Sequence, residues 1–254
     1  MFFEYVYKII INGWQQLLMG VGYTLLIAIT STLIGLVIGL AIGVVRTIPL
    51  SKNKFVRFLQ KTVNVLFSVY IEIFRGTPMM VQSMVIYWGY AFATKSTLPI
   101  IPCAIFIVSV NTGAYMAEIV RGGIISIDKG QFEGAYALGM THFQAMIHVL
   151  IPQVMRNILP SVSNEFVINI KDTSVLSVIG VMELFFIGDT IYKLTLQYFP
   201  TYTVICVIYL ILTFTITRLL RLVEKKLSTD GNYTICGSQS DPRAEIKVKE
   251  GTNG

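Results

Sequence analysis

The chain of 254 residues is 54% hydrophobic and only 13% charged, and its mean hydropathy is +0.67. A soluble domain carries about 25% charged residues, so this chain has too few charged side chains to cover a water-facing surface. The formal net charge of +6 would suit a nucleic-acid-binding protein, but the places of the basic residues indicate membrane orientation instead, and we expect no nucleic-acid partner.

The first predicted membrane helix spans about residues 16–45. Residues 13–45 contain no charged side chain, and about 20 apolar residues are enough to cross a bilayer. The run is also longer than the core of a signal peptide, which is about 7–15 residues. Gly35, Gly39 and Gly43 recur at every fourth position and form a flat face for another helix. The sequence leaves open whether that helix belongs to the same chain or to a second copy.

Four further membrane helices are predicted at about 56–92, 98–121, 155–180 and 199–222. The second is too long for one straight crossing, and Gly76 and Pro78 predict a break or kink within it. Segment 181–198 carries Glu183, Asp189 and Lys193, which favour a short helix near one membrane face.

Together these patterns predict an all-α membrane protein with about five transmembrane helices. Residues 1–227 would form the membrane domain. Residues 228–254 are polar and rich in glycine and charged residues, and they predict a flexible cytoplasmic tail.

Basic residues are concentrated in alternate connections between these helices. Residues 46–61 hold five lysines and arginines and no acid, the next short loop holds only Lys95, and residues 121–156 and the segment after residue 217 are basic again. Loops rich in lysine and arginine stay in the cytoplasm. We therefore expect a multi-pass protein of a cell membrane, with the N-terminus outside and the C-terminus in the cytoplasm.

The long third loop carries apolar residues at helical spacing. They are Phe132, Ala135, Leu138, Phe143, Met146, Ile147 and Leu150. Gly139 lies between two such pieces and predicts a corner. This pattern predicts a pair of short amphipathic helices outside the membrane. Such helices lie either on lipid or in a groove of a partner protein, and the short arms around a glycine favour the groove.

This loop resembles the signature loop of the permeases of ABC importers, with Glu133-Gly134-Ala135, Gly139 and then Ile151-Pro152. Three other stretches are similar to the polar amino-acid branch of that family. They read YIEIFRGTPMMVQ at 70–82, AYMAEIVRGGIISIDKGQ at 114–131 and NEFVINIKDTSVLSVIG at 164–180. The resemblance covers roughly residues 13–227. Gly134 departs from the alanine usual there, and glycine weakens a helix by about 1 kcal/mol.

The resemblance implies a type I ABC importer permease fold with a cytoplasmic coupling helix. It implies two permease chains, identical or related, above two separate ABC ATPase subunits, and an extracellular or periplasmic binding protein that delivers a polar amino acid. Glu133, Gly134, Ala135 and Gly139 would form the contact with the ATPase. ATP and magnesium would be bound by that partner, so we expect no cofactor in this chain.

The chain lacks the motifs of an enzyme or a metal site. A phosphate-binding loop needs G-x-x-x-x-G-K-[ST], and the nearest stretch, GYAFATKS at 89–96, lacks the second glycine. The three cysteines and two histidines show no ligand spacing. Two other functions are compatible with a membrane protein of this kind: an amino-acid transporter driven by an ion gradient, and a non-transporting scaffold or sensor. Internal repeats, common in the first class, are not evident, and the second does not need carboxylates at membrane depth.

Ionisable residues within the predicted spans are candidates for a substrate cavity, because burying charge in a membrane is costly. Glu165, Asn169 and Asp172 fall at i, i+4 and i+7 in the fourth span, and Glu72 lies within the second. Paired carboxylates suit the ammonium or guanidinium group of an amino acid, which slightly favours cationic substrates. Ion pairs of Glu72 with Arg75 and of Asp172 with a basic residue remain the structural alternative.

Overall fold

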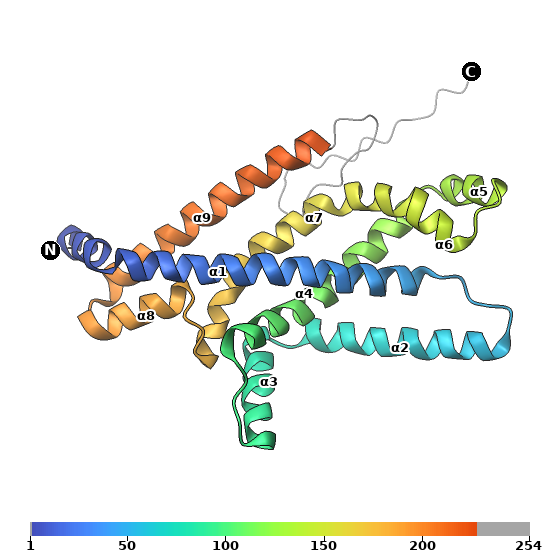
Figure 1. The fold of residues 1–254 in the computed structure, drawn as a ribbon. Coiled ribbons are helices and arrows are strands. Elements are labelled where there is room, and N and C mark those ends of the chain that lie inside the picture. Colours follow the sequence, from blue (N-terminus) through green and yellow to red (C-terminus); the bar gives the residue numbers. More distant parts are fainter. Residues whose placement is uncertain (1, 228–254) are drawn as a thin grey trace.

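The computed structural model describes residues 2–227, and their regular structure is entirely helical (Figure 1). The predicted tail, residues 228–254, lies outside the described residues. In chain order the helices are α1 (Phe2–Thr47), α2 (Lys54–Gly76), α3 (Met79–Thr94), α4 (Ile100–Ile125), α5 (Lys129–Ala137), α6 (His142–Ala145), α7 (Ile151–Asp172), α8 (Leu184–Thr195) and α9 (Tyr198–Leu227). A π-helical segment, Met146–Leu150, precedes α7, and a 3-10 segment, Thr173–Ile179, follows it.

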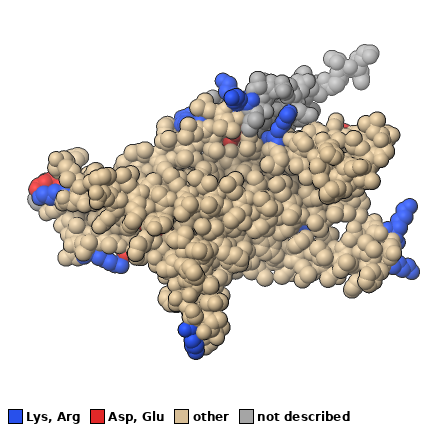
Figure 2. All heavy atoms as spheres, in the orientation of Figure 1, with Lys and Arg blue, Asp and Glu red and all other residues tan. Residues whose placement is uncertain are grey.

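The membrane character of the chain is visible in its surface. By length and hydropathy, α1, α4 and α9 can each cross a bilayer, and the bent pair of residues 142–179 and 184–195 makes a fourth candidate span. The predicted second span corresponds to α2 and α3, which do not meet that criterion among the described helices. Figure 2 shows a broad central surface almost free of charge, with the basic residues mainly at the ends of the molecule.

Helix α1 begins earlier than predicted, at Phe2 instead of about residue 16. Its 46 residues span about 70 Å at 1.5 Å per residue, more than twice the thickness of a bilayer core. The predicted start was wrong because the polar residues near the N-terminus were assigned to a segment outside the helix, whereas they are part of it. There Glu4 and Lys8 form an ion pair of 2.7 Å one helical turn apart, and the ring of Phe2 lies 5.3 Å from that of Phe199.

The three glycines of α1 pack against α4 of the same chain. A Cβ atom at Gly39 would lie 2.3 Å from the Cβ atom of Met116, and Cβ atoms at Gly35 and Gly43 would meet Thr112 and Val120 within 2.9 Å. These approaches leave no room for a side chain. The sequence left open whether these glycines face a helix of the same chain or of a second copy. All three face α4 of the same chain, and we call this close contact between α1 and α4 the seam.

The predicted break in the second span is confirmed. Helix α2 ends at Gly76, Thr77 and Pro78 are extended, and α3 begins at Met79. Figure 1 shows α3 leaving the end of α2 at a steep angle and projecting away from the other helices. Proline cannot donate a backbone hydrogen bond within a helix, which explains why the break falls here.

The prediction of two separate short helices in the third loop was only half right. The first is α5, but the second, α6, continues through the π-helical segment into α7, so the fourth long helix begins near residue 142. Pro152 lies at the start of α7 and lacks the amide that would bond to the carbonyl of His148. The amide of Ile151 bonds instead to the carbonyl of Met146, five residues earlier, and this wider turn carries the helix past the proline.

The short helix predicted within 181–198 is present as α8. Glu183 caps it by accepting hydrogen bonds from the amides of Phe185 and Phe186, at 2.8 and 2.7 Å. Its carboxylate is fully buried and also accepts a hydrogen bond of 2.9 Å from the hydroxyl of Tyr209. This acidic residue therefore stabilises the fold by joining α8 to α9.

We predict that Gly39→Val destabilises the membrane domain by about 1–3 kcal/mol, because the added methyl groups force α1 away from α4. The measurement is the apparent Tm of the purified chain in detergent. The matched control is Gly22→Val, which changes the same helix where a Cβ atom meets nothing within 4 Å. Equal effects of the two substitutions would contradict the seam.

Candidate functional site

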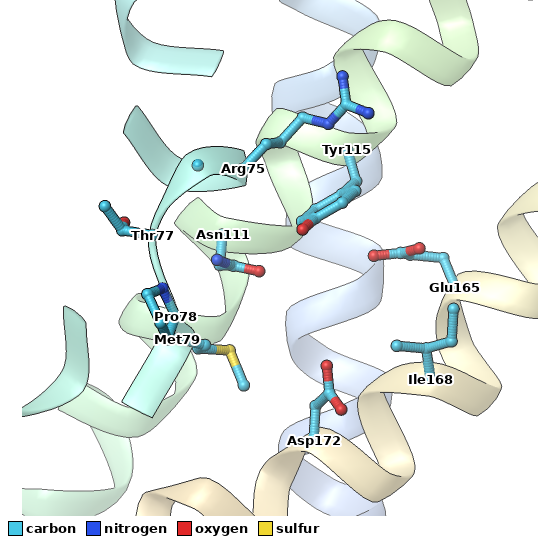
Figure 3. Close-up of a pocket in the computed structure, with 10 residues that line it drawn as sticks. Arg75, Thr77, Pro78, Met79, Asn111, Tyr115, Glu165, Ile168 and Asp172 are labelled. Atoms are coloured by element: carbon cyan, nitrogen blue, oxygen red, sulfur yellow. The ribbon is translucent and has the colours of Figure 1, made fainter. Parts of the chain in front are cut away.

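A cavity of about 490 Å³ opens where the break between α2 and α3 faces α4 and α7 (Figure 3). Its lining residues are Arg75, Gly76, Thr77, Pro78, Met79, Asn111, Tyr115, Glu165, Ile168 and Asp172. One basic and two acidic side chains therefore share the cavity with two broken helix ends. Such broken helices line substrate sites in many membrane transporters.

Glu165 is the most deeply placed charged group of this cavity. Its side chain extends from α7 toward Tyr115 and the α2–α3 break (Figure 3), and the residue is only 8% exposed. Among the described residues, no hydrogen bond or ion pair engages its carboxylate. A buried carboxylate is costly unless a partner compensates it, so the geometry indicates a group that awaits a cation or a donor.

Arg75 and Tyr115 form one wall of the cavity. The guanidinium carbon of Arg75 lies 5.3 Å from the centre of the Tyr115 ring, a cation–π distance. The alternative in which Arg75 pairs with Glu72 is not realised, since no ion pair joins them among the described residues. Arg75 therefore keeps its hydrogen-bond donors free near the cavity.

The helix break is held in place by two amide side chains. Gln82 is 8% exposed, and its Nε2 donates hydrogen bonds to the carbonyls of Phe74 and Thr77 and to the Thr77 hydroxyl, at 2.8–3.0 Å. Asn111 donates to the carbonyl of Phe74 at 3.2 Å and to Oε1 of Gln82 at 2.9 Å. These bonds satisfy backbone carbonyls that the broken α2 leaves open. Neither Gln82 nor Asn111 was singled out from the sequence, although Gln82 ends the stretch at 70–82.

Of the four predicted substrate-binding residues, Glu165 and Asp172 line the cavity, whereas Glu72 and Asn169 do not. Glu72 is exposed on α2. Successive residues of a helix are rotated by about 100° around its axis. Viewed along α7, Asn169 and Asp172 therefore lie on either side of Glu165, and the angle between their directions is about 60°. That rotation is enough to turn Asn169 out of the cavity.

Asn169 instead joins three helices. Its Nδ2 donates to the hydroxyl of Thr32 on α1 at 2.8 Å, and its Oδ1 accepts from the hydroxyl of Thr112 on α4 at 3.1 Å. All three residues are buried. Hydrogen bonds between helices help to hold membrane helices together, so the structure gives Asn169 a role in packing.

A second charged cluster lies toward the C-terminal end of α4. Glu118 accepts hydrogen bonds from Arg46 of α1 at 2.5 Å and from Arg121 at 2.9 Å. Glu118 was not proposed from the sequence as part of an ion cluster, although its spacing of three residues from Arg121 was a signal for a pair. The cluster lies outside the cavity lining and ties α1 to α4.

A turn at Gly139 follows the end of α5. Gly139, at a φ of 76°, ends α5, while the amides of Gly139 and Met140 bond to the carbonyls of Tyr136 and Ala135 at 2.9 and 3.1 Å. This pair of bonds is a Schellman motif, in which glycine takes the left-handed position. The predicted corner at Gly139 is therefore confirmed.

The predicted coupling residues differ in accessibility. Glu133, Gly134 and Gly139 are exposed, but Ala135 is only 4% exposed and packs inward beside Met146 and Leu150. The exposed apolar side chains are instead those of Tyr136, Leu138 and Phe143, and Leu138 is 79% exposed. Leu138 and Phe143 belong to the apolar set for which the sequence predicted contact with lipid or with a partner's groove, and their exposure is compatible with that prediction.

Within residues 2–227 the structure contains no group of three or more metal-ligating side chains. The acidic residues of the cavity, Glu165 and Asp172, can accept hydrogen bonds or form ion pairs. Their partners would be amide, guanidinium or ammonium donors.

Comparison with known proteins places this architecture among transport proteins. Residues 35–229 match the family described as binding-protein-dependent transport system inner membrane component. The glutamine transport system permease protein GlnP of Escherichia coli (strain K12) is 37% identical over 213 residues, which are 83% of this chain and 92% of that protein. The L-cystine transport system permease protein TcyB of Bacillus subtilis (strain 168) is 36% identical over 215 residues, covering 84% and 87%.

A solved structure is similar over nearly the same range. The crystal structure of an amino acid ABC transporter with histidines contains a chain that aligns with a TM-score of 0.72 and 36% identity. The alignment covers 85% of this chain and 96% of that one. The similarity in fold therefore extends over most of the chain.

We predict that Asn169→Leu lowers the stability of the chain by about 1–3 kcal/mol, because it leaves buried hydroxyl groups without their partner. The apparent Tm in detergent reports this loss. Asn164→Leu, at an exposed position of the same helix, is the control and should change the Tm little. Unchanged stability combined with lost substrate transport would assign Asn169 to the substrate instead.

Proposed function

The chain belongs to the family of binding-protein-dependent transport system inner membrane components, and from this premise we propose that it carries a polar amino acid into the cytoplasm, driven by ATP hydrolysis in separate subunits. The relatives named for glutamine and cystine transport support an amino-acid substrate. The N-terminus would face outside and the C-terminus the cytoplasm, as the basic loops indicate.

One observation supports the substrate site most strongly: a buried, unpartnered carboxylate, Glu165, faces a cavity at a helix break. In the proposed site Glu165 accepts hydrogen bonds from a cationic group of the amino acid. Asp172 lies in the same lining and strengthens the negative potential. A neutral solute would leave Glu165 uncompensated, whereas an ammonium group stabilises it.

The carboxylate of the amino acid needs positive charge or amide donors. Arg75 supplies a guanidinium group, and the N-terminus of α3 lies beside it without a side-chain cap. Helix N-termini bind anions through free amide groups. With two acidic groups against one arginine, the lining favours amino acids with an additional positive charge, such as arginine, lysine or histidine.

The α5 loop would couple ATP hydrolysis in the partner subunit to conformational change at this site. We propose that the exposed face around Glu133, Gly134 and Gly139, extended by Leu138, docks into a groove of an ABC ATPase subunit that binds ATP and magnesium. Exposed apolar residues on a short helix suit groove binding. A second permease chain and an extracellular or periplasmic binding protein would complete the importer.

The transport proposal is tested with the complex reconstituted in proteoliposomes, with binding protein supplied on the outside. Uptake should require ATP inside and be independent of ion gradients. Competition among arginine, lysine, histidine, glutamine and cystine identifies the substrate. Uptake driven by a proton or sodium gradient without ATP would contradict the proposal and support a secondary transporter.

In the same assay we predict that Glu165→Gln reduces uptake about tenfold or more, since a hydrogen bond to a charged group is worth about 1.5–3 kcal/mol. Glu72→Gln removes the same charge from an exposed position and should leave uptake near the original rate. Both variants should assemble normally with the ATPase. Full uptake by Glu165→Gln in a well-assembled complex would exclude the cavity role.

We also predict that Gly139→Val uncouples the ATPase, because valine is strained at a φ of 76° and reshapes the end of α5. ATP hydrolysis stimulated by substrate should fall, and the ATPase should co-purify less well. Gly134→Ala is the matched control, since a Cβ atom there meets nothing within 4 Å. If Gly139→Val left coupling and co-purification intact, the loop would not transmit the motion.

A further inference from the structure

A second cavity, of about 430 Å³, lies between the end of α1 and the middle of α2, away from the helix break. The C-terminal turn of α1, the connection that follows it and the first half of α2 form its walls. Its lining residues are Arg46, Ile48, Leu50, Lys61, Asn64, Val65 and Ser68. None of these residues lines the candidate substrate site.

The walls of this cavity are basic. Five lysines and arginines occur between residues 46 and 61, and no acidic residue occurs between residues 46 and 71. Figure 2 shows basic side chains over this end of the molecule. On α2, Lys54, Arg57 and Lys61 repeat at intervals of three and four residues and therefore share one face, and Asn64 continues that face into the cavity.

Beside this basic face, α2 carries two exposed aromatic side chains. Phe55 and Phe58 are 76% and 70% exposed. A helix that combines basic side chains with exposed aromatic side chains is suited to a membrane interface. The cavity is therefore at headgroup depth, on the side that the basic loops assign to the cytoplasm.

Three groups define the chemistry of a ligand. Arg46 is held by Glu118 and by Ser68, at 2.5 and 3.2 Å, while Lys61 is exposed and has no ion-pair partner within residues 2–227. The Oδ1 atom of Asn64 is buried without a hydrogen-bond partner and therefore needs a donor. A ligand with both an anionic group and a hydroxyl group satisfies Lys61 and Asn64 together.

Apolar residues extend the cavity toward lipid. Ile48, Leu50 and Val65 are 38%, 51% and 60% exposed and form a surface on which an acyl chain can pack. Basic pockets between membrane helices on the cytoplasmic side bind lipid headgroups. A free anion would leave these apolar side chains uncovered.

We propose that this cavity binds an anionic phospholipid of the cytoplasmic leaflet whose headgroup carries a hydroxyl group, as in phosphatidylglycerol. The phosphate lies against Lys61 and the outer side of Arg46, the glycerol hydroxyl donates to Asn64, and an acyl chain follows Val65. The lipid would fasten α2 to the end of α1. The inference does not depend on which amino acid is transported.

The test is native mass spectrometry of the assembled transporter, full chain with its ATPase subunits, titrated with phosphatidylglycerol or with phosphatidylcholine of the same acyl chains. We expect phosphatidylglycerol to bind selectively. Lys61→Ala should weaken that binding about fivefold, since one basic residue near an anionic surface is worth about 1 kcal/mol. Asn64→Leu should reduce the preference for phosphatidylglycerol over phosphatidic acid, which lacks the glycerol hydroxyl groups.

Lys54→Ala is the matched control, because it removes the same charge from the same helix outside the cavity lining. An equal loss with Lys54→Ala would overturn the site and indicate general surface electrostatics. Displacement of the lipid by inorganic phosphate at equal concentration would identify a free-anion site instead. Unchanged lipid binding with loss of the ATPase subunits from Lys61→Ala would assign the cavity to a protein interface.

Discussion

The close contact between α1 and α4 is the constraint on which the rest of the structure depends. Lipid gives packed helices no hydrophobic advantage over separate ones, so they associate through close packing and hydrogen bonds. Gly39 brings the two backbones together, and Asn169 then bonds α7 to both helices. Because α4 carries Tyr115 and α7 carries Glu165, this packing fixes the two walls of the candidate substrate cavity.

The cavity itself forms at the break between α2 and α3. A helix broken within a membrane exposes backbone groups that lipid cannot satisfy, and here Gln82 and Asn111 bond to the carbonyls of Phe74 and Thr77. Glu165 is left as a buried acidic residue with no hydrogen-bond or ion-pair partner among residues 2–227. The carboxylate of Glu183 is also buried, but it accepts hydrogen bonds from two amides and a hydroxyl group. Glu183 is therefore a structural acid, whereas Glu165 is available to a ligand.

The sequence allowed the helical class, the break at Pro78 and the corner at Gly139 to be predicted, because each follows from local backbone chemistry. It could not place Asn169 correctly, since a rotation of about 60° along α7 separates the cavity from the helix interface. Ala135 was expected on the outer surface of the loop, but α6 continues into α7 and buries it. The roles of Gln82, Asn111 and Glu118 depend on contacts between distant segments, which a single sequence does not reveal.

The most direct measurement of the central claim is a cryo-electron microscopy map of the assembled transporter, saturated with the amino acid that it takes up best. The account predicts density for that amino acid in the cavity between the helix break and α7, with a cationic group within hydrogen-bond distance of Glu165. Density for the amino acid at another place along the pathway, with the Glu165 cavity empty, would contradict it.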